Sequence, residues 1–125
     1  TGRLVMSDNS DDKPAERVAQ ALNALASTID ARAAEGDASS SYTAKLLAKG
    51  PHKTAKKLGE EAVELAIALT SEEDTAVTAE AADVLFHLLV ALKSRNVSLD
   101  AVAEELISRQ GLSGLVEKAN RPVED

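Results

Sequence analysis

Apolar residues recur every three or four positions along most of this chain, which is the spacing of one face of an α-helix. The first stripe consists of Val18, Leu22, Leu25 and Ile29. Pro14 precedes it, and proline suits the first turn of a helix because it has no amide hydrogen to donate. The pattern therefore predicts a helix from residue 14 to about residue 34.

Three more helices are predicted before the chain reaches residue 95. A short one over residues 41–47 ends at Gly50, and a longer one opens at Pro51 and runs to about residue 70. Its expected buried stripe consists of Ala55, Leu58, Ala62, Leu65 and Leu69. The next helix, over residues 76–94, is apolar on almost every side, and such a helix must be covered on most sides.

A last helix is predicted to start after Ser98, a good N-cap residue, and to end near Gly111. The fold class is therefore all-α, a small bundle of about four to five helices. A bundle of this size cannot surround the apolar helix over residues 76–94, so we expect dimerisation to complete the fold.

The expected domain organisation is simple, because 125 residues correspond to one domain. Residues 14–110 form the all-α domain, residues 1–13 a disordered N-terminus and residues 111–125 a mobile C-terminal tail. Residues 1–5 precede Met6, the only methionine, and we interpret them as an addition before a native start.

Composition excludes several classes of function. Aromatic residues make up 2% of the chain, which favours helices over strands. The net charge of −7 argues against non-specific nucleic-acid binding, which needs a basic surface. The absence of cysteine excludes disulfides and cysteine zinc sites. No apolar run approaches the ~20 residues of a membrane span, so we expect a cytoplasmic protein without a membrane partner.

Four acidic residues lie on helices whose pattern is otherwise apolar. Glu61 and Glu64 are three residues apart and share one face, and so do Glu80 and Asp83. If the two helices are antiparallel neighbours, these carboxylates converge and repel one another. A hard divalent cation such as magnesium relieves that repulsion. Metal-dependent phosphate chemistry is thus the leading hypothesis, and a structural ion pair is the alternative.

Other polar residues leave both a structural and a functional reading open. Lys53, Lys56 and Lys57 form either a solvated helix face or a set of phosphate contacts. Tyr42, with Ser41 and Thr43, either covers the core or lines the mouth of the site. His87 is either a core histidine bonded to Asp83 or a substrate contact. No repeated Glu-x-x-His pattern is present, which argues against a di-iron site.

Three segments carry a resemblance to a known family. They are residues 41–47 (SYTAKLL), 56–64 (KKLGEEAVE) and 80–89 (EAADVLFHLL). Together they resemble phosphoribosyl-ATP pyrophosphohydrolases, and the similarity spans roughly residues 15–108. The acidic pattern alone is shared with the wider MazG-type all-α nucleotide pyrophosphatases. The other residues of these segments narrow the resemblance to the family of the histidine pathway.

The resemblance implies an enzyme that hydrolyses the α–β phosphoanhydride of phosphoribosyl-ATP in the second step of histidine biosynthesis. It also implies a homodimer or a higher homo-oligomer that uses Mg²⁺. By position, the metal ligands are Glu61, Glu64, Glu80 and Asp83. The catalytic candidates are Glu60, for orienting or deprotonating the attacking water, and Glu61. The candidates for substrate binding are Ser41, Tyr42, Thr43, Lys56, Lys57 and His87.

Two other functions fit the same sequence. The first is another MazG-type pyrophosphatase that acts on dUTP or damaged nucleotides, because the same four acids would serve it. The second is a non-catalytic helical dimerisation module whose acids are structural. Pyrophosphate release from a panel of nucleotides separates the three.

Overall fold

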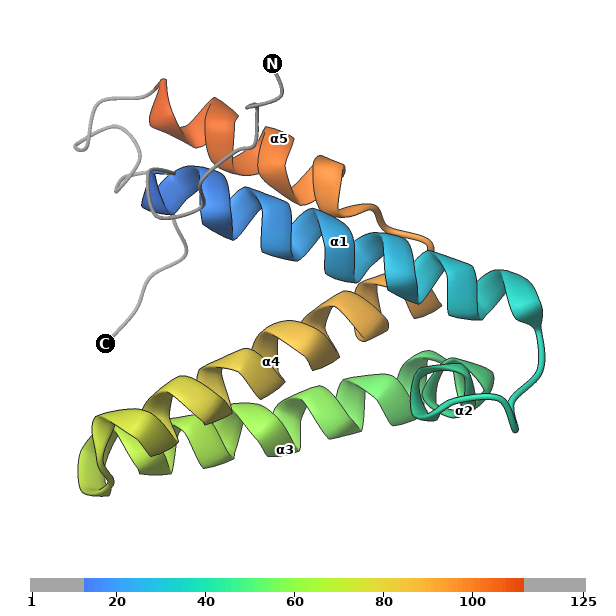
Figure 1. The fold of residues 1–125 in the computed structure, drawn as a ribbon, viewed down its shortest axis with the longest axis horizontal. Coiled ribbons are helices and arrows are strands. Elements are labelled where there is room, and N and C mark those ends of the chain that lie inside the picture. The colour runs from blue at the N-terminus through green and yellow to red at the C-terminus, as the bar shows by residue number, and fades with distance from the viewer. Residues whose placement is uncertain (1–12, 112–125) are drawn as a thin grey trace, which may run out of the picture.

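A computed structural model describes residues 13–111, and this part of the chain consists of helices joined by short turns (Figure 1). The helices are α1 (Pro14–Glu35), α2 (Tyr42–Ala48), α3 (Gly50–Ser71), α4 (Asp74–Ser94) and α5 (Leu99–Gln110). The predicted all-α class is confirmed, and each predicted helix is present. The expectations for residues 1–12 and 112–125 lie outside the described residues.

Local chemistry explains where these helices begin and turn. The Oγ atoms of Ser41 and Ser98 each accept a hydrogen bond of 3.0 Å from the backbone amide three residues later, so both serines are N-caps. Gly50 joins α2 to α3 with a φ of 85°, a value that favours glycine. This turn changes the chain direction sharply, and Figure 1 shows α2 end-on while α3 lies in the plane of the view.

Helices α3 and α4 form an antiparallel hairpin and make the most extensive helix–helix contact of the fold (Figure 1). Helices α1 and α2 cover one end of this hairpin. The core lies where α1, α2 and α4 meet, around Ile29, Leu46, Leu89 and Val90. Figure 1 shows α1 diverging from the other end of the hairpin, so none of the described helices lies over that end.

The predicted buried stripe of α3 is only partly buried in the single chain. Within α3 the buried residues are Thr54, Glu61 and Ala68, whereas Leu69 is 64% exposed. Leu58 and Leu65 are partly buried, and Leu58 lines a cavity together with Leu88 and Ala91 of α4. The other members of the stripe, Ala55, Ala62 and Leu69, are exposed. The apolar pattern identified a helix correctly but not the partner that buries its apolar side chains.

Helix α4 is long and apolar enough to cross a membrane, judged by length and composition alone. Its position in the fold gives another reason for this apolarity, because it contacts α1, α2 and α3. It also carries Glu80 and Asp83, and charged residues are costly inside a bilayer. The helix is thus the central packing element of this fold.

Candidate active site

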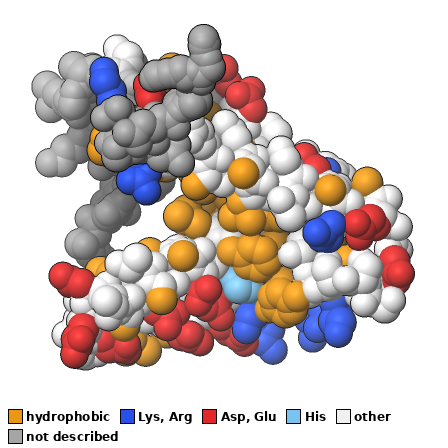
Figure 2. Space-filling model, in the orientation of Figure 1, with side chains coloured by type: hydrophobic (Ala, Val, Ile, Leu, Met, Phe, Trp, Pro, Cys, Tyr) orange, Lys and Arg blue, Asp and Glu red, His pale blue; other side chains and the backbone are white. Residues whose placement is uncertain are grey.

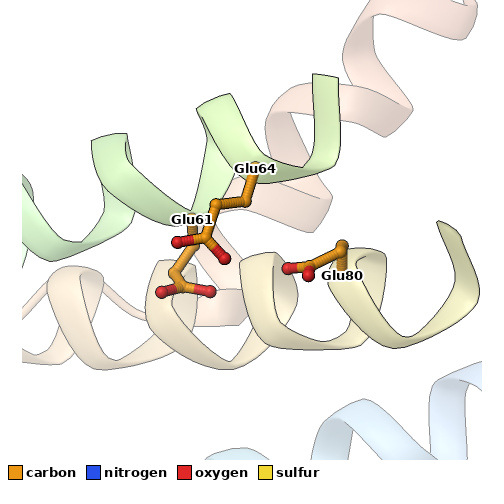
Figure 3. A group of neighbouring side chains, drawn as sticks. All are labelled: Glu61, Glu64 and Glu80. Carbon is orange, nitrogen blue, oxygen red and sulfur yellow. The ribbon is translucent and has the colours of Figure 1, made fainter. Parts of the chain in front are cut away.

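Three of the predicted acidic residues meet between α3 and α4. Glu61 and Glu64 lie one turn apart on α3, and Glu80 faces them from α4 (Figure 3). Each offers a carboxylate oxygen, and these oxygens all lie within 4.8 Å of one another. The antiparallel hairpin produces this approach, because it brings the second half of α3 beside the first half of α4. We call these three residues the glutamate cluster.

Burial makes the glutamate cluster unusual. Glu61 is only 7% exposed, and Oε1 of Glu80 is a buried side-chain oxygen with no hydrogen-bond donor among the described residues. Desolvation raises the pKa of the Glu80 carboxyl above its ordinary value, and the nearby carboxylates of Glu64 and Asp83 raise it further. A buried oxygen without a donor is costly unless a ligand satisfies it.

The donor set of the cluster fits a hard divalent cation. It consists only of carboxylate oxygens, which magnesium prefers to nitrogen or sulfur. The unsatisfied oxygen of Glu80 lies within the group. A cation bound there would supply the partner that Glu80 lacks and would offset the repulsion among the three carboxylates.

Asp83, the fourth predicted ligand, is not part of this close group. It lies one turn after Glu80 on α4 and its side chain is exposed. Its charge still acts on the cluster, because it contributes to the raised pKa of Glu80. Spacing placed Asp83 on the correct face of α4, but the close group is formed by the other three residues.

Lys57 connects the cluster to the start of α3. Its Nζ lies 3.4 Å from Oε2 of Glu61 and 3.9 Å from Oε1 of Glu60. The Glu61 carboxylate raises the pKa of Lys57 and so favours its charged form. The Glu60 side chain is 50% exposed at the rim of the site, where it can reach solvent water.

His87 is buried and its ring nitrogens have partners. Nδ1 lies 2.8 Å from the backbone carbonyl of Asp83, so Nδ1 carries the hydrogen and donates it. Nε2 then accepts from the hydroxyl of Tyr42 at 3.5 Å. The structure thus confirms the predicted bond to Asp83, and the atom that accepts is the main-chain oxygen.

The only two Phe, Trp or Tyr side chains of the chain pack around His87. Phe86 meets the histidine ring edge to face at 4.9 Å between centroids, and Tyr42 stacks on Phe86 at 6.3 Å. Tyr42 is still 54% exposed. Its neighbour Ser41 uses its hydroxyl as the N-cap of α2, and Thr43 is half-buried.

The predicted lysines line a cavity of about 160 Å³ between α2 and α3. Lys56 and Lys57 are joined there by Lys53 and by Lys49, the last of which sequence reasoning did not single out. The available signal was the density of lysines over residues 49–57. Helical spacing could not group them, since the turn at Gly50 separates Lys49 from the rest.

Comparison with known proteins gives consistent matches. A family model described as phosphoribosyl-ATP pyrophosphohydrolase matches residues 22–110. A phosphoribosyl-ATP pyrophosphatase from Jannaschia sp. is 56% identical over 100 residues, which is 80% of this chain and 97% of that protein. Phosphoribosyl-ATP pyrophosphatase 1 from Rhodopseudomonas palustris is also 56% identical, over 80% of this chain and 92% of that protein. The phosphoribosyl-ATP pyrophosphatase of Caulobacter vibrioides is 53% identical over 106 residues, 85% of this chain and 97% of that protein.

Proposed function

The chain belongs to the phosphoribosyl-ATP pyrophosphohydrolase family, and from this premise we propose that it hydrolyses phosphoribosyl-ATP. Water attacks at the α–β phosphoanhydride, and the products are phosphoribosyl-AMP and pyrophosphate. This is the second step of histidine biosynthesis, and we infer a cytoplasmic enzyme. The observation that carries the proposal is the glutamate cluster. Three carboxylates would repel a polyanionic substrate, so a cation bound between them and the phosphates is needed for this reaction.

The proposed cofactor is Mg²⁺, held by the glutamate cluster, with Asp83 as a weaker fourth contributor from one turn further along α4. The support is the all-oxygen donor set and the unsatisfied Oε1 of Glu80. When bound, magnesium supplies the positive charge that offsets the phosphates and activates water for attack.

Side chains around the cluster have distinct proposed roles. Lys57 fixes the Glu61 carboxylate through its 3.4 Å contact and places a positive charge beside the phosphates. Glu60 is exposed beside it and is our candidate for orienting or deprotonating the attacking water. Holding these groups in place before the substrate arrives reduces the entropic part of the barrier.

The side chains of Tyr42, Phe86 and His87 form the proposed wall of the substrate site. Tyr42 presents an exposed ring, and its hydroxyl is directed by His87, which is itself held by the backbone of α4. The N-cap bond of Ser41 holds the start of α2, and thereby Tyr42, in place, and half-buried Thr43 is a further candidate for substrate binding. A flat base can stack on such a ring.

We also infer that the enzyme is a homodimer or a higher homo-oligomer. The support is apolar side chains on the hairpin that the single chain leaves more than 40% exposed, namely Val63, Ile67, Leu69 and Leu85. Such patches mark interaction surfaces in soluble proteins. Sedimentation of the purified protein should give at least twice the 13.1 kDa chain mass, and a species of one chain mass would refute this inference.

The test of function is pyrophosphate release from phosphoribosyl-ATP, measured with Mg²⁺ and with a chelator. We expect release with the metal only. dUTP and the common nucleoside triphosphates are assayed in parallel. A preference for one of them would show that the protein has another MazG-type pyrophosphatase activity. A folded protein that releases pyrophosphate from none of these substrates would be the non-catalytic dimerisation module.

A further inference from the structure

The cavity between α2 and α3 concentrates positive charge in an acidic protein. We call it the lysine pocket, after the residues Lys49, Lys53, Lys56 and Lys57 that line it. It also touches Leu46 and Glu60, and the whole chain has a net charge of −7. Figure 2 shows a group of Lys and Arg side chains beside a histidine, with Asp and Glu side chains gathered on the other side of it.

Most of this charge is not neutralised by the protein. Lys57 pairs with Glu60 and Glu61, but Lys49, Lys53 and Lys56 form no ion pair with a carboxylate of the described residues. Like charges gathered around a small cavity repel one another, and they attract an anion that fits between them. An ammonium group recognises phosphate as a point charge and needs no fixed orientation.

We propose that the lysine pocket binds the phosphate monoester of the phosphoribosyl group. This inference rests on the proposed function, and it assigns to the pocket the one phosphate of the substrate that lies outside the triphosphate. A phosphate monoester carries about −1.5 to −2 charges at neutral pH, which suits three lysines that form no ion pair within residues 13–111.

Distance favours this phosphate over the triphosphate. Lys57 lies at the end of the pocket next to the cluster, 3.4 Å from Glu61, whereas Lys53 lies at the far end, eight residues from Glu61 and thus about 12 Å away along the helix axis. The β and γ phosphates follow the α phosphate directly, so they remain near the glutamate cluster when the scissile bond is there. The phosphoribosyl phosphate is separated from the α phosphate by two riboses and the adenine, which is a span that can reach the pocket.

The pocket thereby becomes a specificity device. ATP carries the same triphosphate and the same base but has no phosphoribosyl group, so it leaves the pocket without a phosphate. Binding energy from a part of the substrate remote from the reacting atoms then distinguishes phosphoribosyl-ATP from the far more common nucleotides.

The test is the double variant Lys53→Gln/Lys56→Gln, which removes two exposed charges. We measure KM and kcat for phosphoribosyl-ATP, and the inhibition constant of ATP as a competing ligand. We expect KM to rise by about tenfold or more, because a hydrogen bond to a charged group is worth about 1.5–3 kcal/mol. The inhibition constant of ATP should rise by a clearly smaller factor, and kcat should fall less than KM rises.

Two comparisons accompany this variant. Arg17→Gln makes the same type of charge change at an exposed residue outside the pocket, and should leave both constants within twofold of wild type, roughly the resolution of such kinetics. Lys53→Arg/Lys56→Arg keeps the charges and should restore most of the affinity for phosphoribosyl-ATP. A melting curve for each variant shows that the fold is retained.

The outcomes separate this inference from the proposed function. If wild type does not hydrolyse phosphoribosyl-ATP, the proposed function fails and this inference fails with it. If wild type is active and the glutamine variant keeps its KM, only the inference fails. Equal rises in KM and in the inhibition constant of ATP would mean that the lysines hold the triphosphate, which also overturns the assignment.

Discussion

The two halves of α3 differ in charge and also in how their charged groups are solvated. The lysine pocket lies at the start of the helix, and three of its four side chains are exposed to water. The α3 part of the glutamate cluster lies further along, where Glu61 is 7% exposed, and Glu80 of α4 adds a buried oxygen that has no donor among the described residues. A bound cation would therefore offset a cost of desolvation in the cluster. The exposed lysines of the pocket are already solvated by water, so an anion there would add binding energy without relieving such a cost.

The variant Glu80→Gln should have the largest effect, because it alters the cluster member whose buried oxygen has no donor among the described residues. Mutation of a group that hydrogen-bonds to a metal ligand typically costs about 10–100-fold in activity. We expect metal-dependent pyrophosphate release by Glu80→Gln to fall by more than that. The helical content should not change. Glu104→Gln, an exposed residue of α5, makes the same charge change outside the site and should remain active. Near-normal release by Glu80→Gln would show that the cluster does not hold the cofactor.

Metal removal should make stability depend on pH in a direction set by Glu80. Its pKa in the folded chain is raised, so between its ordinary and its raised pKa the folded state binds more protons than the unfolded state. The free energy of unfolding of the metal-free protein must therefore fall as pH rises through that window. Melting temperatures in chelator, measured across the acidic range, check this slope.

Mg²⁺ and Glu80→Gln should each flatten that dependence. The cation stabilises the ionised carboxylate, and the amide cannot ionise. If the slope in chelator persists in Glu80→Gln, another carboxyl group is its source.

Asp83→Asn tests whether the fourth carboxylate acts on the metal from outside the close group. We expect a smaller effect than that of Glu80→Gln, namely a rise of about tenfold in the Mg²⁺ concentration needed for half-maximal activity, within the range for groups that support a metal ligand. The maximal rate at saturating Mg²⁺ should be largely retained. A loss that saturating Mg²⁺ does not restore would place Asp83 among the essential ligands.

Tyr42→Phe should have the smallest effect, since it removes a single 3.5 Å contact to His87 at a largely exposed residue. The expected loss of stability in urea unfolding is at most about 0.5 kcal/mol, the lower end for a hydrogen bond. Tyr42→Ala also removes the ring, and it should raise KM for phosphoribosyl-ATP further than Tyr42→Phe does. Equal KM values for the two variants would exclude the ring from substrate binding.

The residue pattern was sufficient to predict the helices and the faces on which the acids lie. Apolar spacing and the capping residues Ser41 and Ser98 are local features, so they act the same way in any tertiary arrangement. Spacing also placed Glu61 beside Glu64, because residues three apart always share a helix face. The sequence motifs indicated the family that the comparisons then showed.

Which charged groups lie together depends on the tertiary packing of the helices. Glu80 approaches the α3 glutamates closely, whereas Asp83 lies one turn away. This depends on the position of α4 along α3 in the packed hairpin. The lysine pocket depends on the turn at Gly50, which brings Lys49 to the side chains of α3. Likewise Leu69 is exposed because no described helix covers its side of α3. These are relations between separate helices, and the periodicity within one helix carries no information about them.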